Sequence, residues 1–321
     1  MPNPPSQPVI DFHVHAFPFW DRSVLSRLPL PIGSVRRKAR SLFSPLTSTM
    51  HRAQTWVRHL PEPARKAVDT LGALTPAPNL LVESSPGDLI ETMDRVGVDQ
   101  AVLIAHEPTI PNSFVLEQCR AHSHRLIAAV TIPAGTPEPA DALRNAHAEG
   151  AKVLKIHAAA EGESPDSLHY NSLLRAATEL GMPVILHTGC LHLPVIYKKP
   201  EYGRVEHFRG WFEEFTGARF VLAHMNFHDP IVALDLCQEF PNLLVDTSWQ
   251  PTETIHEAVR RIGAERVLFG SDWPLVGNNI EVSLSRIDEC VRMDWLTPEQ
   301  AALIRGRNAA RLLGFGESSD A

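Results

Sequence analysis

From residue 86 onward the sequence alternates between segments with helical periodicity and short apolar runs rich in β-branched residues. Short apolar strands separated by helices are typical of a parallel sheet that is buried on both faces. Eight such strands predict an α/β fold, a closed (β/α)8 TIM barrel, and the final segment LTPEQAALIRGRNAARLLGF predicts terminal helices at its bottom or side. The strands are expected in VIDFHVH, QAVLIAH, RLIAAVTIP, AKVLKIHAA, MPVILHTG, ARFVLAHMN, NLLVDTSW and RVLFGSDWP.

Residues 17–85 interrupt this alternation between the first strand and its helix. Several prolines divide the segment into short pieces, and between Pro18 and Val68 ten basic residues stand against two acidic ones. Such charge runs are usually solvated helix faces, but a basic lid would also attract an anionic substrate. An insertion at this point lies on the catalytic face of a TIM barrel. We therefore expect one domain, residues 1–321, with residues 17–85 a lid-like helical insertion.

Composition excludes several classes of protein. The 321 residues are 44% hydrophobic, which is ample for one large core. Four scattered cysteines argue against a disulfide framework or a cysteine zinc site, and a net charge of −7 argues against nucleic-acid binding. Without an apparent signal peptide or an apolar run that could span a bilayer, we expect a cytoplasmic protein with a small-molecule substrate and no membrane partner. A homo-oligomer is compatible with the sequence.

Polar side chains gather where the predicted strands end, which is where the active site of a parallel barrel lies. They are His13 and His15 of the first strand, Lys155 and His157 of the fourth, His187 of the fifth, His224 of the sixth and Asp272 of the eighth. An isolated His-x-His pair is weak evidence for a metal site, because buried histidines often only bind backbone groups. Further ligand-type residues at the same end of the barrel would otherwise be costly polar groups in a core.

The spacing of the histidine pair also predicts which face of the strand the side chains occupy. Alternation along a strand places Asp11, His13 and His15 on one face, with Asp11 as a hydrogen-bonding layer that fixes the histidine tautomers. Together with His187 and Asp272, the pair forms a set of three imidazoles and one carboxylate. Such a set suits Zn²⁺, Fe²⁺, Mn²⁺ or Co²⁺ with one position open for water.

The chain resembles the amidohydrolase superfamily, and more closely its amidohydrolase-related branch, family 2. The resemblance covers Val9 to Phe315 apart from the basic insertion. It is carried by IDFHVH, KVLKIH, PVILHTG, LAHMN, LFGSDWP and NAARLLG. These motifs are specific to the superfamily but not to a substrate.

The resemblance implies a ligand set and a base. His13, His15, His187 and Asp272 would bind a divalent metal ion, with Zn²⁺ as first choice, and Asp272 would also take the proton of the attacking water. His224 would either orient that water or bind a second ion. In binuclear relatives the fourth-strand lysine, here Lys155, is carboxylated and bridges two metals. We predict one ion, with a second at Lys155 and His224 as the alternative.

These features predict a metal-dependent hydrolase that acts on an amide, lactone or ester bond of a small anionic molecule. Asp272 and His224 are its expected catalytic residues, and the expected substrate contacts are His157, Lys155, Trp249, Arg36 and Arg37. The alternative is a non-oxidative decarboxylase, since the same branch includes such lyases. Many of those carry Glu where this chain has His13, which favours the hydrolase modestly. A metal-binding protein without turnover fits less well, because Asp272 and His224 are both present.

Overall fold

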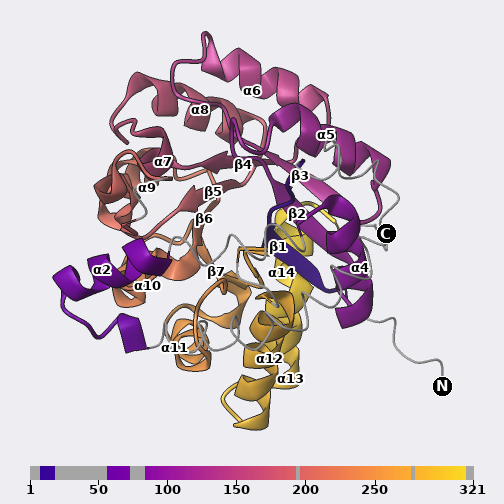
Figure 1. Ribbon diagram of the computed structural model, residues 1–321, viewed down its shortest axis with the longest axis vertical. Coiled ribbons are helices and arrows are strands. Elements are labelled where there is room, and N and C mark those ends of the chain that lie inside the picture. Colours follow the sequence, from indigo (N-terminus) through magenta and orange to yellow (C-terminus); the bar gives the residue numbers. More distant parts are fainter. Residues whose placement is uncertain (1–7, 19–55, 73–83, 193–195, 276–278, 316–321) are drawn as a thin grey trace.

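The computed structural model describes residues 8–18, 56–72, 84–192, 196–275 and 279–315. Eight parallel strands pair in chain order, and backbone hydrogen bonds from Phe12 to Phe269 and from Asp272 to His13 link the last strand to the first. The predicted TIM barrel is therefore confirmed (Figure 1). The strands are β1 (Ile10–Val14), β2 (Gln100–Ile104), β3 (Leu126–Val130), β4 (Val153–Ile156), β5 (Val184–His187), β6 (Phe220–Ala223), β7 (Leu243–Asp246) and β8 (Val267–Leu268).

Helices follow the strands and surround the barrel in Figure 1. The first of them, α4, begins with a capping box in which Ser85 and Asp88 satisfy each other's backbone N–H groups, and it ends at Gly97 in the left-handed conformation. The helices are α4 (Pro86–Val96), α5 (Asn112–Ala121), α6 (Pro139–Ala148), α7 (Ala158–Glu161), α8 (Leu168–Glu179), α9 (Arg209–Glu214), α10 (Pro230–Glu239), α11 (Thr252–Ile262) and α12 (Asn279–Arg292).

Of the terminal helices, α14 (Asn308–Leu312) closes the amino-terminal end of the barrel, and α13 (Pro298–Ala302) packs beside α12 on its outside. Ala309 packs into the apolar cluster inside the barrel, which includes Ile10 and Leu268. The side-chain amide of Asn308 donates to the carbonyl oxygens of Ala264 and Val267 at the start of β8. Because this end is filled, the opposite end, where the strands terminate, is left for a site.

Strand β1 corrects one sequence prediction, because its register with β2 shifts between Asp11 and Val14. The extra residue of this β-bulge breaks the alternation of side chains. Phe12 packs inside the barrel, and Asp11 pairs with Ala101, which belongs to the outer apolar cluster. The expectation that Asp11 shares a face with His13 and fixes histidine tautomers is therefore wrong. Its carboxylate instead accepts the backbone N–H groups of His13 and Ser271.

The described part of the insertion includes α2 (Glu62–Gly72), which lies beside α10 in Figure 1. Arg65 pairs with Asp229, and Asp69 pairs with His228, in the loop that follows β6. This places α2 on the side of the barrel where the strands end. Arg36 and Arg37 lie outside the described residues, so their contact with a substrate stays a prediction. Among the residues that the structure describes, no helix is both long and apolar enough to cross a membrane.

Candidate metal centre

Four histidines and one aspartate meet at the carboxyl ends of the strands. The ring centroids of His13 and His224 are 4.8 Å apart, those of His187 and His224 5.2 Å, and those of His13 and His15 5.4 Å. All of these side chains and Asp272 are buried. The structure thus brings together the four predicted ligands and the predicted catalytic histidine.

Hydrogen bonds define the tautomers of the first two histidines. Nδ1 of His13 lies 2.8 Å from Oδ2 of Asp246, and Nδ1 of His15 lies 3.1 Å from the carbonyl oxygen of Ile104. A carbonyl or carboxylate oxygen only accepts, so both Nδ1 atoms carry the proton. Both Nε2 atoms therefore present lone pairs. Burial, reinforced by the charge of Lys155, holds the pKa of His13 well below its usual range, which keeps this ring neutral.

The Nε2 atoms of His13 and His15 face the carboxylate of Asp272, and this arrangement indicates whether a cation would fit between them. Oδ1 of Asp272 is 3.5 Å from Nε2 of His13 and 3.3 Å from Nε2 of His15, yet it is buried and accepts no hydrogen bond. Nε2 of His187 is also buried without a hydrogen-bond partner. Electron-rich atoms that face one another without a proton between them are stabilised by a divalent ion. His13, His15 and Asp272 are close enough to share one.

Asp272 is held in place from its other side. Its backbone is left-handed, with φ 61°, and the indole Nε1–H of Trp249 donates to its Oδ2 at 2.5 Å. One oxygen of the Asp272 carboxylate is thus fixed by Trp249, and the other is directed at the histidines.

His224 begins a left-handed turn that runs to Phe227, with φ between 45° and 62°. Backbone of this kind costs about 1–3 kcal/mol per residue and persists where the surroundings hold it. Here Gln250 donates to the carbonyl oxygens of His224 and Phe227, and Asp246 accepts the His224 backbone N–H. Nδ1 of His224 lies 2.7 Å from Oγ of Ser248. Burial lowers the pKa of His224, which favours the neutral base.

His157 and Lys155 are buried beside these ligands. The His157 ring stacks on His187 at 3.8 Å, and its Nδ1 accepts the backbone N–H of Ala160 at 3.2 Å. Its Nε2 therefore carries the proton, which suits a donor to a substrate rather than a metal ligand. Burial lowers the pKa of Lys155 to about 8, although the charges of Asp246 and Asp272 oppose this effect.

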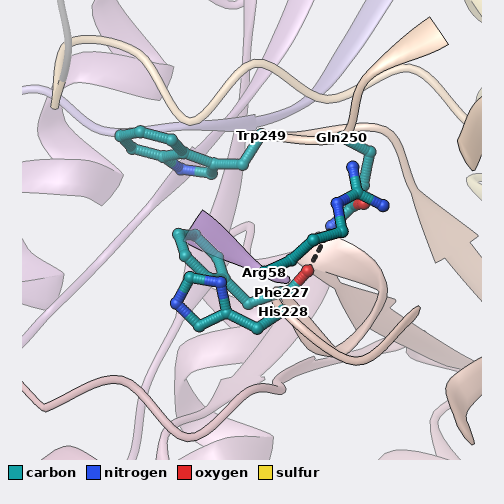
Figure 2. Close-up of a pocket in the computed structure, with 5 residues that line it drawn as sticks. All are labelled: Arg58, Phe227, His228, Trp249 and Gln250. Carbon is teal, nitrogen blue, oxygen red and sulfur yellow. Dashed lines mark hydrogen bonds between the residues drawn. The ribbon is translucent and has the colours of Figure 1, made fainter. Parts of the chain in front are cut away.

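A small pocket adjoins the centre and shares Trp249 with it. Figure 2 shows the rings of Trp249 and Phe227 on one side and Arg58 extending toward Gln250 on the other. Arg58 belongs to the basic insertion, was not singled out from the sequence, and donates to Oγ1 of Thr254 at 2.8 Å. The positive charge of Arg58 is the only feature of the sequence that could have indicated it, and many residues nearby in the sequence share that charge. Trp249 lines this pocket, and its expected contact with a substrate stays a prediction.

The amidohydrolase family model matches residues 10–315. The chain belongs to the amidohydrolase family. No curated protein matches it. Among solved structures, an uncharacterised TIM-barrel protein from Bordetella bronchiseptica shares 18% identity at a TM-score of 0.65, covering 96% of this chain and 98% of that one.

Two further structures carry activities in their descriptions. A 5-carboxyvanillate decarboxylase from Sphingomonas paucimobilis shares 15% identity at a TM-score of 0.62, covering 97% of this amidohydrolase and 100% of its own chain. A probable 2-pyrone-4,6-dicarboxylic acid hydrolase from Acinetobacter baumannii shares 16% identity at a TM-score of 0.60, covering 96% and 99%. At these identities the similarity establishes the fold, so the choice between hydrolase and decarboxylase rests on the site.

Proposed function

We propose that this amidohydrolase is a metal-dependent hydrolase that adds water to an amide, lactone or ester bond of a small anionic molecule. His13, His15, His187 and Asp272 would hold one divalent ion, with Zn²⁺ as first choice. When bound, such an ion lowers the pKa of water from nearly 16 to about 7 and polarises a carbonyl group. The residues around it must then place the substrate and move one proton.

The observation that carries this proposal is the state of Asp272. Its Oδ1 is buried and accepts no hydrogen bond from the described residues, while Trp249 holds its Oδ2. A carboxylate held in this way at the edge of a metal centre can take the proton of an attacking water and return it to the leaving group. His224, with its Nδ1 proton engaged by Ser248, leaves Nε2 as an acceptor that can orient the same water.

The surrounding groups favour an anionic substrate. Lys155 is a buried amine within the barrel, and Nε2–H of His157 is a donor beside His187. Trp249 and Phe227 supply aromatic surface, with ring centroids 5.7 Å apart, and Arg58 supplies a guanidinium group at the edge of the same pocket. We infer that a planar carboxylic acid derivative enters here, under an insertion that acts as a lid.

Decarboxylation is the second candidate, and one observation favours it. A buried cation such as Lys155 can also hold the carboxylate that leaves as CO₂, and a donor such as His157 can orient a neighbouring hydroxyl group. Solved structures of similar fold are described as decarboxylases of 5-carboxyvanillate and 2,6-dihydroxybenzoate. The two reactions differ in what enters the product, because hydrolysis adds an oxygen atom from water and decarboxylation adds only a hydrogen.

Isotope incorporation decides between them. The metal-loaded enzyme is incubated with carboxylate-bearing lactones, esters and amides, with 2-pyrone-4,6-dicarboxylic acid, and with 5-carboxyvanillate and 2,6-dihydroxybenzoate. In H₂¹⁸O we expect one ¹⁸O atom in the product carboxylate and no CO₂. Release of CO₂ together with one deuterium atom in the product formed in D₂O would establish the decarboxylase instead.

A further inference from the structure

Asp246, at the end of β7, contacts two functional histidines from two other strands. Its Oδ2 lies 2.8 Å from Nδ1 of His13. Its Oδ1 accepts the backbone N–H groups of His224 and Ser248, each at 3.0 Å, and the hydroxyl group of Ser248. Asp246 is completely buried, so these contacts are its whole environment for hydrogen bonding among the described residues.

The direction of each hydrogen bond follows from the acceptor. A carboxylate accepts only, so Ser248 uses its single hydroxyl proton on Asp246 and can offer His224 only a lone pair. Nδ1 of His224, 2.7 Å from that oxygen, must therefore be the protonated nitrogen. The chain from Asp246 through Ser248 fixes the His224 tautomer, and the direct bond from Asp246 fixes the His13 tautomer.

Resting on the proposed function, we propose that Asp246 is a positioning residue that sets two tautomers at once. Through its direct bond it keeps Nε2 of His13 available to a metal ion. Through Ser248 it keeps Nε2 of His224 available to water. Ser248 thus affects one of these functions, and Asp246 affects both.

The amide of Asn cannot replace this carboxylate in either orientation. With its NH₂ group at the Oδ1 position, it would face two backbone N–H donors and a hydroxyl proton. With its NH₂ group at the Oδ2 position, it would donate to Nδ1 of His13 and move the ring proton to Nε2. Replacing a residue that hydrogen-bonds to a metal-binding histidine typically changes metal affinity 10–100-fold.

Thr247, between the two residues, provides a matched control. It is also fully buried, and its hydroxyl group exchanges hydrogen bonds with the backbone of Gly270, not with either histidine. Thr247→Val therefore removes a buried hydroxyl from the same segment without touching the proposed chain. It controls for a general loss of packing or stability.

The experiment measures Zn²⁺ and Mn²⁺ affinity by competition with a chromophoric chelator, which needs no substrate. We expect Asp246→Asn to weaken affinity about 10–100-fold, and Ser248→Ala and Thr247→Val to stay within about threefold of the parent. Parent-like affinity in folded Asp246→Asn overturns the His13 part of the proposal. A loss in Ser248→Ala equal to that in Asp246→Asn overturns the separation of the two functions.

Histidine ¹⁵N NMR of the metal-free proteins reads the tautomers directly. We expect protonated Nδ1 on His13 and His224 in the parent, a mixed His224 tautomer in Ser248→Ala, and the parental pattern in Thr247→Val. A proton on Nε2 of either histidine in the parent overturns the proposal even if Asp246→Asn does not fold. Because both readouts are independent of turnover, they can succeed or fail whichever reaction the isotope experiment identifies.

Discussion

Residue by residue, hydrogen bonds separate histidines that look equivalent in the sequence. His15 donates through Nδ1 to the carbonyl oxygen of Ile104, whereas Nδ1 of His157 accepts the N–H of Ala160. The first ring therefore offers a lone pair at Nε2 and the second offers a proton. His15, the proposed metal ligand, and His157, the proposed substrate donor, thus differ in which backbone group lies beside Nδ1.

Asp272→Asn is expected to fold and to lose turnover by several orders of magnitude. The amide either turns its NH₂ group toward His13 and His15 or meets the indole N–H of Trp249 as a second donor, and it accepts no proton in either orientation. Steady-state rates with circular dichroism check this. Asp235→Asn, which alters an exposed aspartate paired with Arg261, should retain the parental rate. Turnover of Asp272→Asn within tenfold of the parent would remove the proton-transfer role.

Arg58 is expected to bind the anionic group of the substrate. A planar guanidinium group holds a carboxylate through two parallel hydrogen bonds, which an ammonium group cannot reproduce. Arg58→Lys should therefore raise KM for an anionic substrate about as much as Arg58→Ala does, on the order of tenfold. The KM for a neutral ester of the same substrate should not change in either variant. The matched control is Arg65→Ala, a change in the same insertion as Arg58. It removes the ion pair of Arg65 with Asp229. An unchanged KM in Arg58→Ala would place the anion elsewhere.

The π-helical turn Leu303–Arg307, between α13 and α14, packs closely against the start of the first strand. A Cβ atom on Gly306 would lie 1.9 Å from the carbonyl oxygen of Pro8, just before β1. Overpacking against backbone costs about 1–3 kcal/mol or more. We expect Gly306→Ala to lower the free energy of unfolding by at least that amount in urea. Gly210→Ala in α9, where a Cβ meets nothing within 4 Å, should be neutral or stabilising. Equal stabilities would show that this close approach does not hold the barrel end.

The strands were predictable because each is a short apolar run, and the site because its polar residues end those runs. What escaped prediction depends on contacts between strands. The β-bulge of β1 separates the face of Asp11 from that of His13, and the periodicity of a sequence does not show an extra residue in one strand of a pair. The hydrogen bonds of Asp246 with His13 and His224 link β7 to β1 and β6. The only feature of the sequence that could have indicated this role of Asp246 is a carboxylate at the end of a strand.

Considered as one molecule, the barrel is expected to keep its core without a metal ion. The inner and outer apolar clusters and the terminal helices are complete without the histidines. We expect the chelator-treated protein to stay folded with a lower Tm. An ion at 1,000 times its Kd adds about 4 kcal/mol to stability. Circular dichroism melts before and after metal is restored measure this difference. Complete unfolding on chelation would make the centre a structural one.

The number of ions follows from how the carboxylates are used. His13, His224 and Asp246 form a second group of suitable size, but both oxygens of Asp246 already accept hydrogen bonds. The proposed site for one ion is therefore formed by His13, His15 and Asp272, with the unpartnered nitrogen of His187 as the proposed fourth ligand. We expect one equivalent of metal per chain, unchanged in Lys155→Ala with or without bicarbonate. Two equivalents in the parent that fall to one or none in Lys155→Ala would instead make Lys155, whose burial lowers its pKa to about 8, a bridging carbamate.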